Sequence, residues 1–181
     1  MSKPVMGLIL AVTLSSTVVS TQGQSAAPAD TLAPLARLVG RWTGASEGQP
    51  GKGQVERQYE RVLRSRFIQV RNRSTYPPQE KNPKGETHED IGFFSFDRTR
   101  KRVVFRQFHV EGFVNQYVLD PSSTVDRVVF VSESIENIPQ GFRARETYVF
   151  TASDQVEEIF EMAEPGKDFE VYSRSRLTRA Q

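Results

Sequence analysis

From residue 41 to the end of the chain, apolar and polar residues alternate in short runs with a period of two. Turn-forming Gly, Pro, Asn and Asp residues separate ten runs: 41–48, 54–62, 66–76, 87–97, 101–110, 112–119, 125–134, 142–151, 155–163 and 168–178. The pattern predicts an all-β domain of antiparallel strands. Because almost no helix is available to cover a sheet, we expect a single closed up-and-down barrel, which removes free edges. Ten strands also leave room for an interior cavity.

The segment before the first strand predicts one short helix over 32–39. Asp30 or Thr31 is placed to cap its N-terminus, and Gly40 follows its last turn. A helix in this position is expected to close one end of the barrel, so residues 28–181 form one β-barrel domain.

The first 27 residues have the pattern of a secretory signal and leader. Lys3 is followed by a run without charge over 5–19 and then by small residues. The apolar run is shorter than the roughly 20 residues of a membrane-spanning helix. We therefore expect a periplasmic or secreted protein with no membrane span after signal removal. A retained N-terminal anchor is the alternative interpretation.

Strand alternation identifies side chains that face the barrel interior. Glu146 and Glu158 fall on faces that are otherwise apolar, and an unpaired buried carboxylate is costly. Two interpretations stay open: a wet cavity with an Arg partner, or a different register that places both residues at strand ends. The other candidate ligand-binding residues chosen by alternation are Arg57, Tyr59, Phe105, His109, Tyr117 and Tyr148.

Gly40-Arg41-Trp42 opens the first strand directly after the predicted helix. This G-x-W resembles the start of lipocalins and related calycin barrels, and the resemblance implies that Trp42 plugs the closed end beneath an Arg of the last strand. Alternation with Leu177 pointing inward, together with Phe169 and Val171, favours Arg179 for that contact, with Arg176 second.

The segment His88-Glu89-Asp90-Ile91-Gly92-Phe93-Phe94 resembles the H-x-E-x-G-aromatic segment of nitrobindin-like haem-binding β-barrels, with Asp90 where the family usually has Glu. That family ligates haem through a last-strand His that precedes Leu-x-Arg. Here Leu177-Thr178-Arg179 is present without the His, and Tyr172 or Ser173 takes its place. Since a Tyr phenolate can ligate ferric haem, the resemblance suggests haem as a cofactor with Tyr172 as ligand.

Each histidine has two interpretations. His88 is a polar residue at the barrel rim or, as the family segment favours, part of a ligand pocket. His109 is a residue at the strand end or faces the cavity with Phe105 and Gln107. Together the two could flank a planar ligand, or they pair across neighbouring strands. Neither a metal-binding motif nor a Ser-His-Asp order accompanies them.

Composition removes several classes of function. The chain has no Cys, which excludes disulfides, thiol catalysis and zinc sites built from Cys, and two histidines are too few for a His-rich metal cage. The net charge of +2 comes without a long run of like charges, so no nucleic-acid partner is expected. Without an assembled catalytic set, we expect a binding protein rather than an enzyme.

These observations lead to one main hypothesis: an exported barrel that binds a small hydrophobic or amphipathic molecule in its cavity. The alternative, from the resemblance, is a haem-binding protein that acts on nitric oxide or peroxynitrite. A third is a small isomerase or cyclase with Glu146 or His88 as base. A monomer and a homodimer are both compatible with the sequence.

Overall fold

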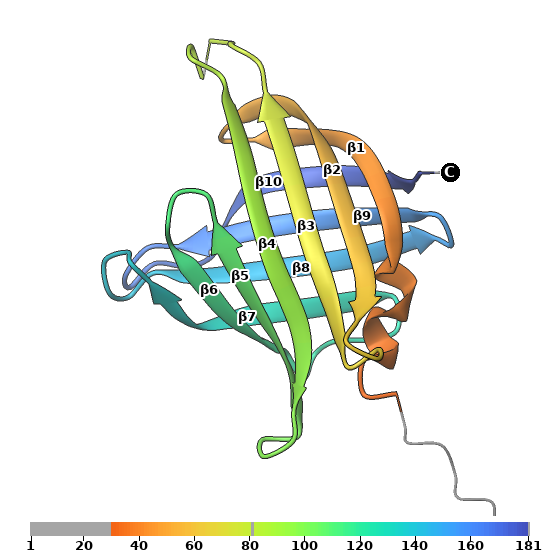
Figure 1. Ribbon diagram of the computed structural model, residues 1–181. Helices are drawn as coiled ribbons and strands as arrows, with labels where there is room; N and C mark the ends of the chain where they lie inside the picture. The colour runs from red at the N-terminus through yellow and green to blue at the C-terminus, as the bar shows by residue number, and fades with distance from the viewer. Residues whose placement is uncertain (1–29, 81, 181) are drawn as a thin grey trace, which may run out of the picture.

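The computed structural model describes residues 30–80 and 82–180 as one closed barrel of ten antiparallel strands (Figure 1). A short 3-10 helix, η1 (Ala33–Leu38), precedes the barrel. The strands are β1 (Gly40–Gly48), β2 (Gly51–Val62), β3 (Phe67–Tyr76), β4 (Glu86–Asp97), β5 (Arg102–His109), β6 (Val114–Leu119), β7 (Arg127–Glu136), β8 (Arg143–Ala152), β9 (Gln155–Ala163) and β10 (Glu170–Arg179). All ten predicted strands are thus confirmed.

The barrel closes between its first and last strands. Each strand pairs with its neighbours in the chain, and β1 pairs with β10 in a register that runs from Trp42↔Arg179 to Gly48↔Ser173. No strand in the described part of the chain is left with a free edge. Removal of free edges is the physical reason for a closed barrel.

The end of the barrel next to η1, called here the closed end, is packed solid. Inward-facing side chains from most of the strands form one apolar cluster with Leu35 and Leu38 of the helix. Its largest fully buried members include Trp42, Tyr59, Phe94, Phe105, Tyr117, Phe130 and Tyr148. Large aromatic residues fill the barrel interior here, so no space for a ligand is left at this end.

Trp42 closes the barrel as predicted. Its side chain is fully buried, and its indole Nε1–H donates to the carbonyl oxygen of Leu38 at 2.7 Å. The guanidinium carbon of Arg179 lies 4.2 Å from the centre of the Trp42 ring. Arg179 also donates from Nη1 to the carbonyl oxygen of Val39, at 2.6 Å. The last strand therefore fastens the helix and the first strand together.

Three details of the predicted last strand were wrong. Phe169, expected to point inward, instead packs against Arg143 and Arg145, whose guanidinium carbons lie 4.9 and 4.4 Å from the centre of its ring. Arg176, the second choice for the Trp42 contact, points outward and pairs with Glu47 at 3.1 Å. Val171 is exposed rather than inward-facing, because a register shift between Val171 and Ser173 interrupts the alternation in β10. A bulge of this kind is invisible to a strict period of two.

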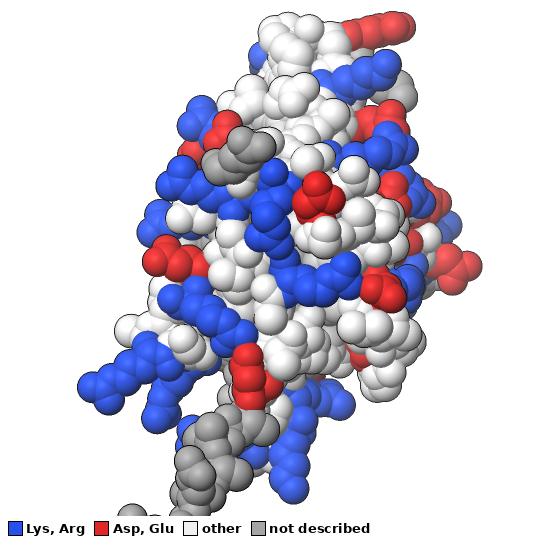
Figure 2. All heavy atoms as spheres, turned by 90° about the vertical axis from the view of Figure 1, so that its right-hand side faces the viewer, with Lys and Arg blue, Asp and Glu red and all other residues white. Residues whose placement is uncertain are grey.

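The outer surface carries charges of both signs. Figure 2 shows Lys and Arg side chains interspersed with Asp and Glu over one face of the molecule. Ion pairs of this surface include Arg37–Asp126 at 2.7 Å and Arg61–Asp30 at 2.6 Å. Among the described residues, no helix has the length and apolar character needed to cross a membrane. The predicted signal and leader, 1–27, lie outside the described residues.

Candidate functional site

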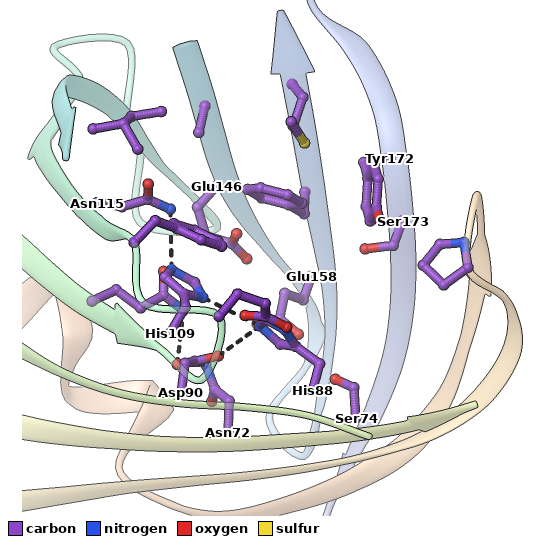
Figure 3. Close-up of a pocket in the computed structure, with 18 of the residues that line it drawn as sticks. Asn72, Ser74, His88, Asp90, His109, Asn115, Glu146, Glu158, Tyr172 and Ser173 are labelled. Carbon is purple, nitrogen blue, oxygen red and sulfur yellow. Dashed lines mark hydrogen bonds and ion pairs between the residues drawn. The ribbon is translucent and has the colours of Figure 1, made fainter. Parts of the chain in front are cut away.

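A cavity of about 450 Å³ occupies the other end of the barrel, called here the open end (Figure 3). Its volume lies in the range of about 300–1,000 Å³ that is usual for small-molecule sites. Polar side chains follow the aromatic core along the inward faces of the strands, and beyond the core the inward side chains leave a space between them. The structure thus favours the first of our two interpretations of Glu146 and Glu158, a cavity within the barrel.

Seven buried polar residues form a ring at the base of the cavity, called here the polar belt. They come from seven strands and all line the cavity: Arg57, Asn72, Asp90, Gln107, Asn115, Glu146 and Glu158. Arg57 is the register partner of Asn72, and Asn72 is the register partner of Asp90. The belt therefore lies at one level of the barrel, between the packed core and the cavity.

An ion pair crosses the interior within the belt. Nε of Arg57 on β2 donates to Oε2 of Glu158 on β9 at 2.9 Å, and both side chains are more than nine-tenths buried. Nη1 of Arg57 donates to the hydroxyl of Ser74 at 3.2 Å. Burial by itself lowers the pKa of Arg57, but Glu158 together with Tyr59 and Asp90 outweighs that effect and raises the pKa, so the guanidinium stays charged. Arg57 is the predicted Arg partner.

Two further carboxyl groups of the belt hold their protons more tightly than usual. Burial raises the pKa of Glu146 well above its ordinary value, and the nearby charge of Glu158 raises it further. Burial also raises the pKa of Asp90 to about 6, although a hydrogen bond from Gln107 opposes the shift. Oδ1 of Asp90 accepts from Asn72 at 2.9 Å and from Gln107 at 2.8 Å. Burial therefore favours the protonated form of both carboxyl groups.

Several buried oxygens of the belt have no hydrogen-bond partner in the described protein. They are Oδ1 of Asn72, Oδ1 of Asn115 and Oε1 of Glu146. Buried polar groups are nearly always paired, because an unpaired one costs about 1–3 kcal/mol. The two amide oxygens can only accept a hydrogen bond. A molecule that carries N–H or O–H groups would satisfy this side of the cavity.

The two histidines meet at the wall of the cavity, as Figure 3 shows. His88 on β4 and His109 on β5 pair across neighbouring strands, with 3.2 Å between His88 Nε2 and His109 Nδ1. Nδ1 of His88 also lies 2.7 Å from a carboxylate oxygen of Glu111, in the turn after β5. Burial lowers the pKa of His109 to about 3, and the nearby His88 lowers it further, so the ring is neutral at physiological pH.

The rest of the wall is mostly apolar. Its apolar and aromatic members include Phe113, Ile135, Ile138, Phe160, Met162 and Tyr172. Phe113 stacks on the His109 ring, with 4.0 Å between ring centres, and Tyr172 contacts Phe160 edge-on at 5.8 Å. The cavity therefore has a polar base beneath a wall that is largely apolar, a division that suits an amphipathic molecule.

Six of the ten candidate ligand-binding residues line this cavity: Arg57, His88, His109, Glu146, Glu158 and Tyr172. The other four, Tyr59, Phe105, Tyr117 and Tyr148, belong to the packed core of the closed end. Alternation correctly placed all four inside the barrel. A period of two does not tell at which level along the barrel axis the packed core ends and the cavity begins.

Sequence reasoning missed Asn72, Asp90, Asn115 and Glu111 as site residues. The first three had a usable signal, because each lies on an inward face together with apolar residues, as Asn72 does with Val70 in β3. Polar residues at such positions mark a wet interior just as Glu146 does. Glu111 had no comparable signal, since it lies in a turn.

Comparison with known proteins agrees with this geometry. A family model described as "THAP4-like, heme-binding beta-barrel domain" matches residues 31–179. Among solved structures, the chain is similar to Rv2717c from M. tuberculosis, with a TM-score of 0.63 and 18% sequence identity, over 83% of this chain and 98% of that one. At this level of identity the likeness concerns the fold. No curated protein matches the chain.

The family description raises the question of haem, whose iron needs an axial ligand from the protein. Tyr172 stands on the last strand, where the resemblance places that ligand. Burial raises the pKa of the Tyr172 phenol, and the carboxylate of Glu86 raises it further. The groups around this phenol therefore favour its protonated form, whereas ligation of ferric iron needs the phenolate.

The histidines do not replace the missing ligand. Their facing nitrogens are 3.2 Å apart, so a porphyrin bonded through one imidazole would occupy the space of the other. Asp90, Glu146 and Glu158 line the adjoining base of the cavity, where the flat porphyrin would need apolar contacts. The residues of this cavity therefore do not fit haem.

Proposed function

The chain belongs to the family of THAP4-like, heme-binding beta-barrel domains, and from that premise we propose that it binds one small amphipathic molecule in its barrel cavity. The head of the ligand lies on the polar belt, and its apolar part lies against Phe113, Phe160 and Met162 nearer the open end. The observation that carries the proposal is the set of buried, unpartnered oxygens on Asn72, Asn115 and Glu146.

The chemistry of the belt favours a particular head group. The charge of Arg57 is already balanced by Glu158, while Asp90 and Glu146 add acidic groups and the free amide oxygens add acceptors. A head that donates hydrogen bonds, such as an amine or a hydroxyl, satisfies these groups. A carboxylate head placed on the polar belt would be disfavoured, because it would face the carboxylates of Asp90 and Glu158, and Arg57, the one cation of the belt, is already paired.

A series of probes that share one alkyl chain tests the proposal. Octylamine and octanol should bind more tightly than octanoate in calorimetric titrations. Glu146→Leu should weaken octylamine binding, because it removes an acceptor at the base of the cavity. Glu157→Gln, next to Glu158 but near Arg174 and Arg176 on the outer face, should leave binding unchanged. Equal or tighter binding of octanoate would contradict the proposed head group.

Haem is the competing occupant, since the family takes its name from it. A haem titration in the same experiment separates the two. A Soret shift that disappears in Tyr172→Phe would favour haem and contradict our assignment. We expect no such shift, since the surroundings of Tyr172 favour the protonated phenol over the phenolate and the histidine nitrogens face one another.

We also propose that the protein is exported to the periplasm or secreted. The support lies in the sequence: Lys3, the uncharged run over 5–19 and the small residues that follow it. The absence of cysteine is consistent with this, because the barrel needs no disulfide in an oxidising compartment.

A further inference from the structure

We propose that His88, His109 and Glu111 bind one divalent cation of the zinc class at the wall of the cavity. A ligand atom of each residue lies within 4.8 Å of those of the other two, and all three side chains line the cavity. The site goes beyond the proposed function, since an ion can occupy it without any organic molecule in the barrel.

The spacing of the two imidazoles suits a single ion. His88 Nε2 and His109 Nδ1 are 3.2 Å apart, so both can lie at the usual Zn–N distance of about 2.0–2.1 Å from one metal between them. A bare ion fits this gap, whereas a porphyrin does not. Neither nitrogen needs a large movement of its strand to reach the metal.

A carboxylate is available as the third ligand. An oxygen of Glu111 lies 2.7 Å from Nδ1 of His88, and the side chain is about half exposed. Because it extends from a turn, it can rotate toward the ion with little cost. On the deeper side, Oδ2 of Asp90 lies 3.7 Å from Nε2 of His88, which adds negative charge beside the metal.

The surroundings hold His109 in the orientation that a metal ligand needs. Phe113 stacks on one face of its ring. Nε2, the nitrogen away from His88, lies 3.2 Å from Nδ2 of Asn115, and the buried Oδ1 of that amide has no partner. A metal bound at Nδ1 leaves the proton on Nε2, and turning the Asn115 amide over then places Oδ1 against Nε2–H. In that metal-bound state Oδ1 no longer accepts from a ligand in the cavity, whereas Asn72 and Glu146 still can.

The ligand set also indicates which ions bind. Two imidazoles and one carboxylate suit Zn²⁺, Co²⁺, Ni²⁺ or Cu²⁺, whereas Ca²⁺ and Mg²⁺ prefer an all-oxygen shell. Three protein ligands leave the fourth coordination position of a tetrahedral zinc ion open. Since all three line the cavity, a molecule bound inside the barrel could donate an oxygen or nitrogen atom to that position.

The composition of the chain makes the test unusually direct. The sequence has no cysteine, and His88 and His109 are its only histidines, so any metal–imidazole signal from tag-free protein must come from this pair. Zn²⁺ titration followed by imidazole ¹⁵N NMR should shift both histidines at one equivalent. Co²⁺ should give visible absorption bands of a low-coordinate site.

Three substitutions complete the experiment. His109→Gln and Glu111→Gln should each weaken Zn²⁺ binding by at least about tenfold, and the exposed turn position of Glu111 keeps the barrel intact in that variant. Glu89→Gln is the matched control, because Glu89 adjoins His88 on β4 but pairs with Arg73 outside the barrel, at 3.6 Å. Failure of Zn²⁺ to bind, or binding that both substitutions leave unchanged, would overturn the proposal.

Discussion

At the scale of single residues, the two buried glutamates on neighbouring strands differ in what they do for stability. Glu158 is paired with Arg57 at 2.9 Å, whereas Oε1 of Glu146 has no partner and burial raises the pKa of its carboxyl group. The first glutamate balances a buried charge. The second has no cation paired with it, and its burial favours the protonated form.

Glu158→Gln should therefore destabilise the protein by about 3–5 kcal/mol, because it leaves the Arg57 charge buried and unbalanced. Denaturant unfolding at pH 7 measures this loss. Glu157→Gln on the outer face is the control and should change the free energy of unfolding by no more than about 0.5 kcal/mol. A Glu158→Gln protein as stable as that control would contradict the importance of the ion pair.

Glu146→Gln should change how the stability of the protein depends on pH. The folded pKa of Glu146 lies above its unfolded value, so its contribution to stability is present at low pH and is lost as pH rises from about 4.5. The variant lacks this loss, while Asp90 and His109 titrate in both proteins. The melting temperature of the variant relative to wild type should thus be higher at pH 8 than at pH 5. A constant difference would show that Glu146 ionises normally.

At the scale of elements, the last strand connects three parts of the closed end. Arg179 of β10 covers the Trp42 ring of β1 and donates to carbonyl oxygens of Val39 and Arg37 beside η1, at 2.6 and 2.7 Å. A 3-10 helix of six residues has little stability of its own. These contacts and the burial of Leu35 and Leu38 hold it on the barrel.

Trp42→Ala should cost about 3–5 kcal/mol, as for other large aromatic residues removed from a core. Arg179→Ala should cost less, since the cation–π contact is worth about 0.5–2 kcal/mol, with two hydrogen bonds in addition. Thermal unfolding by circular dichroism measures both. Arg176→Ala is the matched control on the same strand and should be nearly neutral, because Arg176 is largely exposed. A Trp42→Ala protein that melts normally but loses ligand would place Trp42 in the binding site instead.

At the scale of the whole molecule, the barrel has two ends with different roles. The closed end is an apolar core that stabilises the fold, and the open end contains the cavity, the polar belt and the histidines. Substitutions at the closed end should therefore affect stability, and most substitutions at the open end should affect ligand binding. Glu158 is the exception, because it belongs to the cavity and also balances a buried charge.

The proposed export applies to the chain as a whole. Protein recovered from the periplasm or the medium should lack about the first 27 residues, as intact mass spectrometry would show. Its melting temperature should be the same under oxidising and reducing conditions, because the sequence has no cysteine. Full-length protein that stays in the cytoplasm, or a mature protein that keeps its N-terminus in the membrane, would contradict export by a cleaved signal.

The sequence by itself determined the strands and the closure of the barrel. Alternation with a period of two located all ten strands, because alternation depends on near neighbours in the chain. The Trp42–Arg179 contact was implied by the resemblance of the G-x-W to calycin barrels, and alternation from Leu177 selected Arg179 for it. It also left two interpretations of Glu146 and Glu158 open, of which the structure favours the cavity with an Arg partner.

Only the tertiary structure decided where the core ends and the cavity begins. Tyr59 and Arg57 occupy successive inward positions of β2, yet one lies in the core and the other lines the cavity. The difference comes from what the opposite strands place at the same height: Tyr148 lies against Tyr59, and Glu158 pairs with Arg57. The meeting of His88 with Glu111 likewise depends on how β4 pairs with β5 and where the following turn lies. Strand period carries no information about such distances, because they are set by register and by contacts across the barrel between residues far apart in the chain.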